Sequence, residues 1–379
     1  MKLPSTDLNK IHTQGLYRQR IATIKNKGCA VFYGKDHIDF TSNDYLGLRQ
    51  HPHIKKRLCD AAMEYGFGSG ASAMISGCSP ETEHLEEEFA QFIGYPKALL
   101  FQSGYHANLA VTSVLCNDAE IIFADKLIHA SIIDGLRLSS LKFKRFPHQD
   151  FEALIHFKQC FQNSYCITEG VFSMEGDITN LEHLHHITKN KSIIIVDDAH
   201  GFGVFGTDGR GCINYHRLTY RQIPICIIPF GKAMAGMGAM VCAPEAMIEK
   251  LMQFSRSYIY STALPPAIVS ALRASLEILS TEQVRRDQLF ENISLFNELC
   301  NKFDINVLSQ DHTPIRSIVI GSNTKTLQVQ KSLMNQGFWV SCIRPPTVVD
   351  NTSRLRISLS AMHTTKQVQN LVSALRKCL

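Results

Sequence analysis

The sequence predicts an α/β protein in which a large domain with a mostly parallel sheet precedes a smaller α+β domain. Short apolar runs alternate with helical stretches, and these runs are 98–101, 121–123, 164–168, 192–196 and 225–229. They are continuous rather than half-polar, which is typical of parallel strands buried on both faces. Because active sites in such sheets gather at the carboxyl ends of the strands, polar residues that follow these runs are the first candidates for a site.

The pattern changes after about residue 265. A long amphipathic stretch covers 267–303, and a final helix is expected from about residue 364. Between them lie short strand-like runs at 317–321, 338–343 and 355–360. We therefore expect an N-terminal segment over 1–40, a large domain over 41–265 and a small C-terminal domain over 266–379. Residues 8–25 are polar and predict a helix in the N-terminal segment.

Composition excludes several classes of protein. The 379 residues are 45% hydrophobic and can bury a large core, and a net charge of +5 does not suggest a nucleic-acid partner. The twelve cysteines form no C-x-x-C pair, which fits a reducing cytoplasm better than a zinc ribbon or a disulfide framework. The N-terminus has no signal-peptide core, and no apolar run reaches the ~18–20 residues of a membrane span. We expect a cytoplasmic protein without nucleic-acid or membrane partners.

The stretch "DDAHGFGVFG" over 197–206 contains the spacing G-x-G-x-x-G. A dinucleotide loop starts at the strand end and needs an acid about 20 residues further on, whereas residues 217–224 contain none. Asp197 and His200 carry the more consistent interpretation, because both would lie at the carboxyl edge of the sheet. A buried carboxylate there needs a cationic partner, for which a protonated pyridine nitrogen would serve. Asp197 as a simple turn cap is the alternative, and the role of Asp198 stays open.

A lysine lies in the small, apolar stretch "IPFGKAMAGMGA". Lysine is rarely buried unpaired, and desolvation would lower the pKa of Lys232 and make it a Schiff-base nucleophile. A surface lysine is the simpler alternative. A P-loop is excluded because Ala233 replaces the Ser or Thr that binds magnesium. Met234, Met237 and Met240 are expected to be core packing.

The stretch "FQSGYHANLA" over 101–110 places Ser103 and Gly104 between a strand and a helix that begins near Tyr105. The N–H groups at such a helix start form a cradle for an anion. Together with a lysine and a strand-end aspartate, this cradle indicates a cofactor that bears a phosphate.

At this point a family resemblance is specific. The stretches that carry it appear in order over residues 40–364: "FTSNDYLGL", "GSGASAMISG", "DKLIHAS", "TEGVFSMEGDI", "VDDAHGFGVFG", "FGKAMAGMGA", "YIYSTALPP" and "IRPPTVVDNTSRLRISLSAMHT". The sequence resembles the α-oxoamine synthases, which use pyridoxal 5'-phosphate (PLP). The resemblance implies fold type I, with a large domain built on a mostly parallel seven-stranded sheet, and a homodimer with its site at the subunit interface.

The resemblance is greatest to members that condense L-alanine with a pimeloyl thioester in biotin biosynthesis, releasing CO2 and a free thiol. The acyl group would arrive on coenzyme A or on an acyl carrier protein. Relatives that use glycine, such as 5-aminolevulinate synthase and 2-amino-3-ketobutyrate CoA ligase, stay open as alternatives, as do relatives with long acyl donors of the autoinducer and sphingoid-base type. Outside this class, a cofactor-free scaffold subunit and a nicotinamide oxidoreductase are the other readings.

The resemblance implies a catalytic role for three residues. Lys232 would hold PLP covalently and shuttle the proton at the substrate Cα, Asp197 would pair with the pyridinium nitrogen, and His200 would be a proton donor. His200 would also bind the phenolic oxygen of PLP, together with Ser173. His129 would stack on the ring face.

The remaining cofactor contacts implied by the resemblance surround the phosphate. Gly104 and Tyr105 would offer their N–H groups to it. Ser261 and Thr262 would approach it from the partner subunit.

The resemblance also implies substrate contacts. Arg356 would bind the carboxylate of the amino acid, since a guanidinium suits bidentate binding, and Asn43 would lie close to the substrate. Arg18 and Arg20 are both candidates for the far carboxyl group of the pimeloyl chain, and the spacing does not choose between them.

This sequence departs from the family in three places. Pro229 stands where relatives often have Thr, so a hydroxyl contact to the phosphate would be lost. Thr82 stands where many relatives have His, and His84 is two places further on. His106 replaces a small or apolar residue and would either reach the phosphate or simply cap the helix, which we favour.

Three histidines, His183, His185 and His186, lie in one short helical stretch. Only His183 and His186 would share a helix face, and no ligand from a strand end is evident. A solvated helix face is therefore the expectation, and we expect no metal site.

Overall fold

The structure is a computed structural model that describes residues 5–26, 28–32, 34–139, 141–158, 161, 163–189 and 191–379. The chain divides into two compact units, which are described one at a time. Unit 1 comprises Met1–Gly47, Ser173–Asp177 and Val284–Leu379, and unit 2 comprises Leu48–Phe172 and Ile178–Gln283. Segments that are distant in sequence therefore share a unit. The boundaries predicted near residues 40 and 265 divide the chain into continuous domains, and they stay a prediction.

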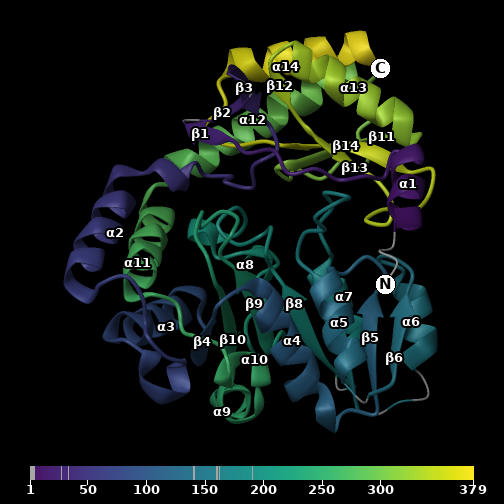
Figure 1. The fold of residues 1–379 in the computed structure, drawn as a ribbon. Helices are drawn as coiled ribbons and strands as arrows, with labels where there is room; N and C mark the ends of the chain where they lie inside the picture. The colour runs from purple at the N-terminus through teal and green to yellow at the C-terminus, as the bar shows by residue number, and fades with distance from the viewer. Residues whose placement is uncertain are drawn as a thin grey trace. The chain divides into compact units, whose positions relative to one another are not determined.

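Unit 2 contains a seven-stranded sheet in the order β4-β10-β9-β8-β7-β5-β6 (Figure 1). Its strands are β4 (Lys97–Phe101), β5 (Ile121–Asp125), β6 (Phe143–Phe146), β7 (Ser164–Glu169), β8 (Ser192–Asp197), β9 (Ile225–Pro229) and β10 (Ala239–Ala243). The pairs from β6 to β9 are parallel, and β10 is antiparallel to both β9 and β4. The predicted α/β class with a mostly parallel sheet is confirmed, and all five predicted strands are present.

The helices of unit 2 lie alongside this sheet or extend from it (Figure 1). They are α2 (Pro52–Tyr65), α3 (Pro80–Ile93), α4 (Gly104–Val114), α5 (Ala130–Leu138), α6 (Phe151–Lys158), α7 (Leu181–Thr188), α8 (Cys212–Tyr215), α9 (Glu245–Phe254), α10 (Arg256–Ile259) and α11 (Pro266–Thr281). Ser79 caps α3 by accepting the N–H of Thr82, so Thr82 has a structural role at this helix start. His84 is exposed on the same helix.

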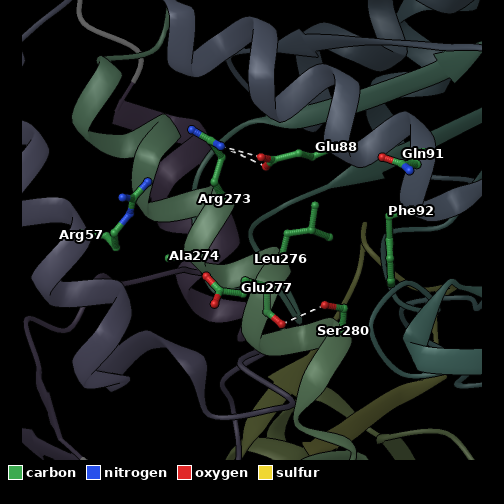
Figure 2. Close-up of a pocket in the computed structure, with 9 residues that line it drawn as sticks. All are labelled: Arg57, Glu88, Gln91, Phe92, Arg273, Ala274, Leu276, Glu277 and Ser280. Atoms are coloured by element: carbon green, nitrogen blue, oxygen red, sulfur yellow. Dashed lines mark hydrogen bonds and ion pairs between the residues drawn. The ribbon is translucent and has the colours of Figure 1, made fainter.

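Helix α11 packs on α2 and α3, and Figure 2 shows the groove that these helices form. It has a volume of about 440 Å³. Arg273 of α11 donates to both carboxylate oxygens of Glu88 and of Glu81 on α3. These ion pairs join α11 to α3, and Arg57 of α2 lies 3.9 Å from Glu81.

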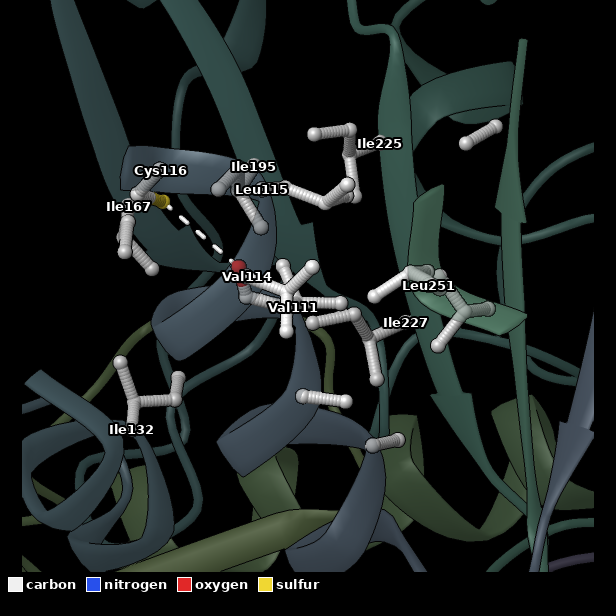
Figure 3. Packing of buried hydrophobic residues seen from close by; sticks show 14 of the residues in the cluster. Val111, Val114, Leu115, Cys116, Ile132, Ile167, Ile195, Ile225, Ile227 and Leu251 are labelled. Carbon is white, nitrogen blue, oxygen red and sulfur yellow. Dashed lines mark hydrogen bonds between the residues drawn. The ribbon is translucent and has the colours of Figure 1, made fainter. Parts of the chain in front are cut away.

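The core of unit 2 lies between the sheet and helices α4 and α5. Figure 3 shows Val111 and Val114 of α4 and Ile132 of α5 together with Ile195 and Ile227 of the sheet. All five side chains are nearly or fully buried. Burying aliphatic side chains of this size contributes roughly 1.5–3 kcal/mol each, so this cluster fixes the position of α4 against the strands.

The described residues of unit 1 form two small sheets and four α-helices. The sheets have the orders β1-β2-β3-β12 and β11-β14-β13. Their strands are β1 (Ile24–Asn26), β2 (Cys29–Phe32), β3 (Lys35–Asp39), β11 (Ile315–Gly321), β12 (Phe338–Trp339), β13 (Ser341–Ile343) and β14 (Ser353–Ser358). The helices are α1 (Ser5–Thr13), α12 (Gln283–Lys302), α13 (Asn323–Asn335) and α14 (Thr365–Cys378). An α+β arrangement at the C-terminus is thus present as expected.

Two local expectations are wrong. The helix predicted over 8–25 ends at Thr13, because the chain turns at Gly15, which adopts a φ of 64° that favours glycine. The strand predicted over 338–343 divides, because β12 pairs with β3 whereas β13 pairs with β14. Between the two, the side chain of Gln330 donates to the carbonyl of Val340 and satisfies it outside both sheets.

We expect Gly135→Ala to lower the free energy of unfolding by about 1–3 kcal/mol, the usual cost of overpacking a core. A Cβ at this position would overlap Thr112 Oγ1 and lie 3.1 Å from Thr112 Cβ, at the crossing of α4 and α5. Urea unfolding measures the change. Adding Thr112→Ala should recover part of the loss, and an unchanged stability in Gly135→Ala would contradict the packing described here.

Candidate active site

A cavity of about 300 Å³ opens in unit 2 where the carboxyl ends of β7, β8 and β9 meet the start of α4. Its lining residues are Ser103, Gly104, Tyr105, Asn108, His129, Glu169, Asp197, Ala199, His200, Pro229, Gly231, Lys232, Gly236, Met237 and Gly238. The structure thus brings together six residues that the sequence had singled out: Lys232, Asp197, His200, His129, Gly104 and Tyr105. Their individual roles stay predictions.

Asp197 ends β8 and is almost fully buried. Its Oδ1 accepts the N–H of Ala199 at 3.1 Å, and its Oδ2 accepts Nδ2 of Asn108 at 2.8 Å. Burial raises the pKa of this carboxyl, and the hydrogen bond from Asn108 is the largest effect that opposes the rise. Two accepted bonds leave further lone pairs of the carboxylate available to a cationic group in the cavity.

The start of α4 provides the anion cradle. Ser103 caps the helix by accepting the N–H of His106, which leaves the N–H groups of Gly104 and Tyr105 without an acceptor inside the helix. A Cβ at Gly104 would lie 2.7 Å from Cγ of Pro229, so glycine is required here. Pro229 lines the cavity without a hydroxyl, and His106 does not line it. The helix cap is Ser103 and not His106, whose Nδ1 is buried without a hydrogen-bond partner among the described residues. The prediction that His106 caps the helix is therefore wrong.

Lys232 lies in a tight loop between β9 and β10. The carbonyl of Lys232 accepts the N–H of Ala235, and the N–H of Gly236 bonds back to Phe230. These turns hold the base of the lysine while its side chain reaches the cavity. Of the three methionines expected to be core, Met234 and Met240 are buried, but Met237 is 57% exposed and lines the cavity, so the core expectation is wrong for Met237.

Two residues of the cavity were missed by sequence reasoning. Asn108 lies four residues after Gly104 on α4, a spacing that places both on one helix face. Glu169 ends β7 and pairs in register with Asp197 of β8. The rule that active sites gather at carboxyl ends of parallel strands would have found Glu169.

The second acid, Asp198, does not line the cavity. It is buried, and its Oδ2 accepts the backbone N–H of Cys212 at 2.8 Å. A Cβ on Gly170, Gly201 or Gly211 would overlap its carboxylate oxygens. All three glycines of the G-x-G-x-x-G spacing thus serve the loop: Gly201 makes room for Asp198, and Gly203 and Gly206 adopt a positive φ.

Ser261 and Thr262 do not line the cavity of their own chain. Thr262 forms a bridge with Ser72, and the N–H of Ala263 bonds to the carbonyl of Ala71. This arrangement is compatible with the expectation that these residues serve the partner subunit, which stays a prediction.

In unit 1 the structure groups Arg356, Asn43 and Ser173. Nη1 and Nη2 of Arg356 each donate to Oδ1 of Asn43 at 3.1 Å, and Nε donates to the carbonyl of Ser173 at 2.6 Å. The guanidinium is nearly buried. Its fork therefore already holds an oxygen acceptor in the manner that suits a carboxylate.

A groove of about 610 Å³ in unit 1 is lined by Arg18 but not by Arg20. Arg18 lines it and donates to Oγ1 of Thr347 at 2.9 Å. Trp339 and Ile343 supply apolar surface in the same groove. Arg20 is exposed and does not line the groove.

The three histidines of α7 lie in a surface depression together with Lys189. The ring of His183 stacks on Phe151 at a centroid distance of 5.2 Å. Within the described residues, no three His, Cys, Asp or Glu side chains gather as metal ligands would. The described helices also include none with the length and apolarity to cross a membrane.

Comparison with known proteins agrees with this fold and site. A family model described as aminotransferase class I and II matches residues 35–375, so the chain belongs to the aminotransferase class I and II family. Curated relatives named 8-amino-7-oxononanoate synthase include one from Saccharophagus degradans, 44% identical over 90% of this chain and 86% of the relative. Another, from Methylococcus capsulatus, is 39% identical over 98% and 97%.

Solved structures give the same result. The 8-amino-7-oxononanoate synthase of Francisella tularensis is 43% identical with a TM-score of 0.81, covering 90% of this chain and 97% of that one. A serine palmitoyltransferase of S. paucimobilis with a bound PLP–myriocin adduct is 26% identical with a TM-score of 0.92, covering 98% and 95%. The predicted family resemblance and fold type I are confirmed.

The raised pKa of Asp198 predicts that the stability of the fold depends on pH. Burial raises its pKa from 3.8 to about 7, so the folded chain favours the protonated carboxyl, and stability falls as pH rises between these two values. We expect Asp198→Asn, which keeps an oxygen for the Cys212 N–H, to gain roughly 2 kcal/mol relative to the parent chain between pH 5 and pH 8. Urea unfolding across this range measures it.

Asp208→Asn is the matched control, because Asp208 lies in the same loop but is 47% exposed. Parallel pH profiles for the parent chain and Asp198→Asn would contradict the expected contribution of Asp198.

Proposed function

We propose that this chain is a PLP-dependent acyltransferase that condenses L-alanine with a pimeloyl thioester to give 8-amino-7-oxononanoate, CO2 and the free thiol in biotin biosynthesis. The observation that carries the proposal is the convergence of Lys232, Asp197 and His200 on one cavity beside an anion cradle. The relatives that share this fold over most of their length bear the name of that activity.

The residues of the cavity fit PLP. An amine, a buried carboxylate, an imidazole and a helix start with unbonded N–H groups match the aldehyde, the ring nitrogen, the phenolic oxygen and the phosphate of that cofactor. The glycine at position 104 keeps the cradle open. PLP bound here supplies an electron sink for negative charge that develops at the amino-acid Cα.

The chain supplies the remaining functions in our proposal. Nζ of Lys232 accepts the Cα proton of alanine and returns it after CO2 has left. Asp197 keeps a proton on the ring nitrogen, and His200 donates a proton to the carbonyl oxygen formed in the condensation.

Further contacts complete the proposed site. His129 stacks on the ring, and Ser173 assists His200 at the phenolic oxygen. In unit 1, Arg356 exchanges the amide oxygen of Asn43 for the alanine carboxylate.

A homodimer is part of the proposal. Unit 2 exposes large apolar side chains, among them Phe67, Ile75 and Tyr260, and two in the cavity wall, Tyr105 and Met237. Such surface is typical of an interface between subunits. Ser261 and Thr262 of one subunit would then complete the phosphate site of the other.

We propose the cytoplasm as the compartment. The eleven cysteines that the structure describes are all free thiols, and six of them are buried. Free thiols persist in a reducing compartment. Coenzyme A and an acyl carrier protein are both retained as carriers of the pimeloyl group.

We expect the purified chain to release CO2 and thiol fastest with L-alanine and a pimeloyl thioester. The assay compares alanine with glycine, and pimeloyl with acetyl, succinyl and palmitoyl thioesters on coenzyme A and on carrier protein. Lys232→Ala should lose at least 10³-fold in rate, the order of magnitude for removing a group that moves a proton. A preference for glycine would refute the substrate assignment, and a colourless chain without PLP would refute the enzyme.

The groove in unit 1 favours Arg18 over Arg20 for the far carboxylate of the pimeloyl chain. We expect Arg18→Ala to raise KM for the pimeloyl thioester about tenfold or more with a smaller change in kcat, because a charge-assisted hydrogen bond is lost. KM for a heptanoyl thioester, which lacks that carboxylate, should not change. Arg20→Ala is the control, and a larger KM effect in that variant would reverse the assignment.

A further inference from the structure

A chain of hydrogen bonds leads away from the candidate carboxylate. Nδ2 of Asn108 donates to Oδ2 of Asp197 at 2.8 Å and to Oγ of Ser131 at 2.9 Å. Oγ of Ser131 lies 2.7 Å from Nδ1 of His129. Three elements, α4, β8 and the start of α5, are thereby joined through side chains, of which Asn108, Asp197 and His129 line the cavity.

The order of donors along this chain is fixed by chemistry. A carboxylate accepts only, so the group of Asn108 that faces Asp197 must be its amide nitrogen. Its second N–H meets the hydroxyl of Ser131, which then has one proton left to donate. That proton goes to Nδ1 of His129, which also accepts the backbone N–H of Ser131 at 3.3 Å.

We propose that Asn108 and Ser131 are positioning residues that hold Asp197 ready for a cationic partner and keep Nδ1 of His129 an acceptor. This inference rests on the proposed function, because it assigns the two residues to the same PLP site. Neither residue needs to touch the substrate. Asn108 acts on the carboxylate, and Ser131 orients both the amide of Asn108 and the imidazole.

The side chains of Asn108 and Ser131 are buried, so their hydrogen bonds to each other and to Asp197 do not compete with water. Asn108 and Ser131 are 2% and 0% exposed. Within the described part of the chain, Oδ1 of Asn108 has no hydrogen-bond partner. A buried amide that leaves its acceptor unsatisfied while using both donors is oriented by those donors, since the reverse orientation would set oxygen against oxygen at Asp197.

The consequence for the cofactor follows from the carboxylate. Without the donor from Asn108, the buried carboxyl of Asp197 would hold its own proton more tightly and compete with the ring nitrogen for it. A ring nitrogen that carries less positive charge withdraws less electron density, so the Lys232 nitrogen that is bonded to PLP becomes more basic. The pH midpoint of the PLP absorbance should then move upward.

The test uses the PLP-loaded protein and four variants. Asn108→Ala should weaken PLP binding about ten- to hundredfold and raise the absorbance midpoint by about one pH unit, the scale of a hydrogen bond to a charged group. Asn108→Asp keeps the shape of the side chain without its donors, so it should show the same weakening above neutral pH. Ser131→Ala should change both readouts in the same direction but less. Ser113→Ala, which removes a hydroxyl that donates to the carbonyl of Leu109 on α4, should change neither.

A second readout does not involve PLP. In the cofactor-free protein at pH 8, nitrogen NMR should show His129 with its proton on Nε2, and Ser131→Ala should produce detectable Nδ1–H form. A parent chain that binds no PLP would refute the proposed function. The tautomer of His129 would still test the hydrogen-bond chain in that case. A parent chain that binds PLP, with both Asn108 variants matching Ser113→Ala in affinity and midpoint, would overturn the inference.

Discussion

The site depends on one buried carboxylate. Asp197 lies at the end of β8 with little access to water, and burial raises its pKa. Two hydrogen bonds oppose this rise in pKa, one from the Asn108 amide and one from the backbone N–H of Ala199. A carboxylate in this condition is stabilised when a cation enters the cavity, because the cation replaces the water that folding removed. The buried carboxylate of Asp197 thus favours the binding of a positively charged group beside it.

Strand geometry explains why two adjacent acids behave differently. Successive side chains at the end of a strand point to opposite faces, so Asp197 reaches the cavity while Asp198 enters the loop behind it. There Gly170, Gly201 and Gly211 leave room for its carboxylate, and the backbone of Cys212 donates to it. The second acid therefore holds the loop that follows β8, which answers the question that the sequence left open.

Sequence reasoning found the parts of the site that chain order alone determines. The strands ending at Asp197 and Pro229 and the helix starting at Gly104 follow from local apolar patterns and capping. Strand β10 was missed, because its residues Ala239–Ala243 follow the lysine loop and resemble its small-residue run. Asn108 was missed because an asparagine inside a helix carries no local signal, and its partners Asp197 and Ser131 are distant in sequence. The exposure of Met237 could not be predicted from the sequence, since an apolar residue in such a stretch can line a cavity as well as a core.

The cluster in unit 1 shows how an arginine that we propose as a carboxylate anchor is ordered by its own neighbours. Both Nη atoms of Arg356 donate to one amide oxygen of Asn43, and Nε is held by the carbonyl of Ser173. Tyr45 also donates to that amide oxygen, at 3.2 Å, so the acceptor position is defined from several sides. When a carboxylate takes the place of the amide oxygen, a neutral acceptor is exchanged for a charged one and the bonds strengthen. Because the guanidinium is already ordered and partly desolvated, little side-chain entropy remains to be lost on binding. Folding therefore already orders most of this proposed anchor, so little of the binding free energy of a carboxylate would be offset by ordering the side chain.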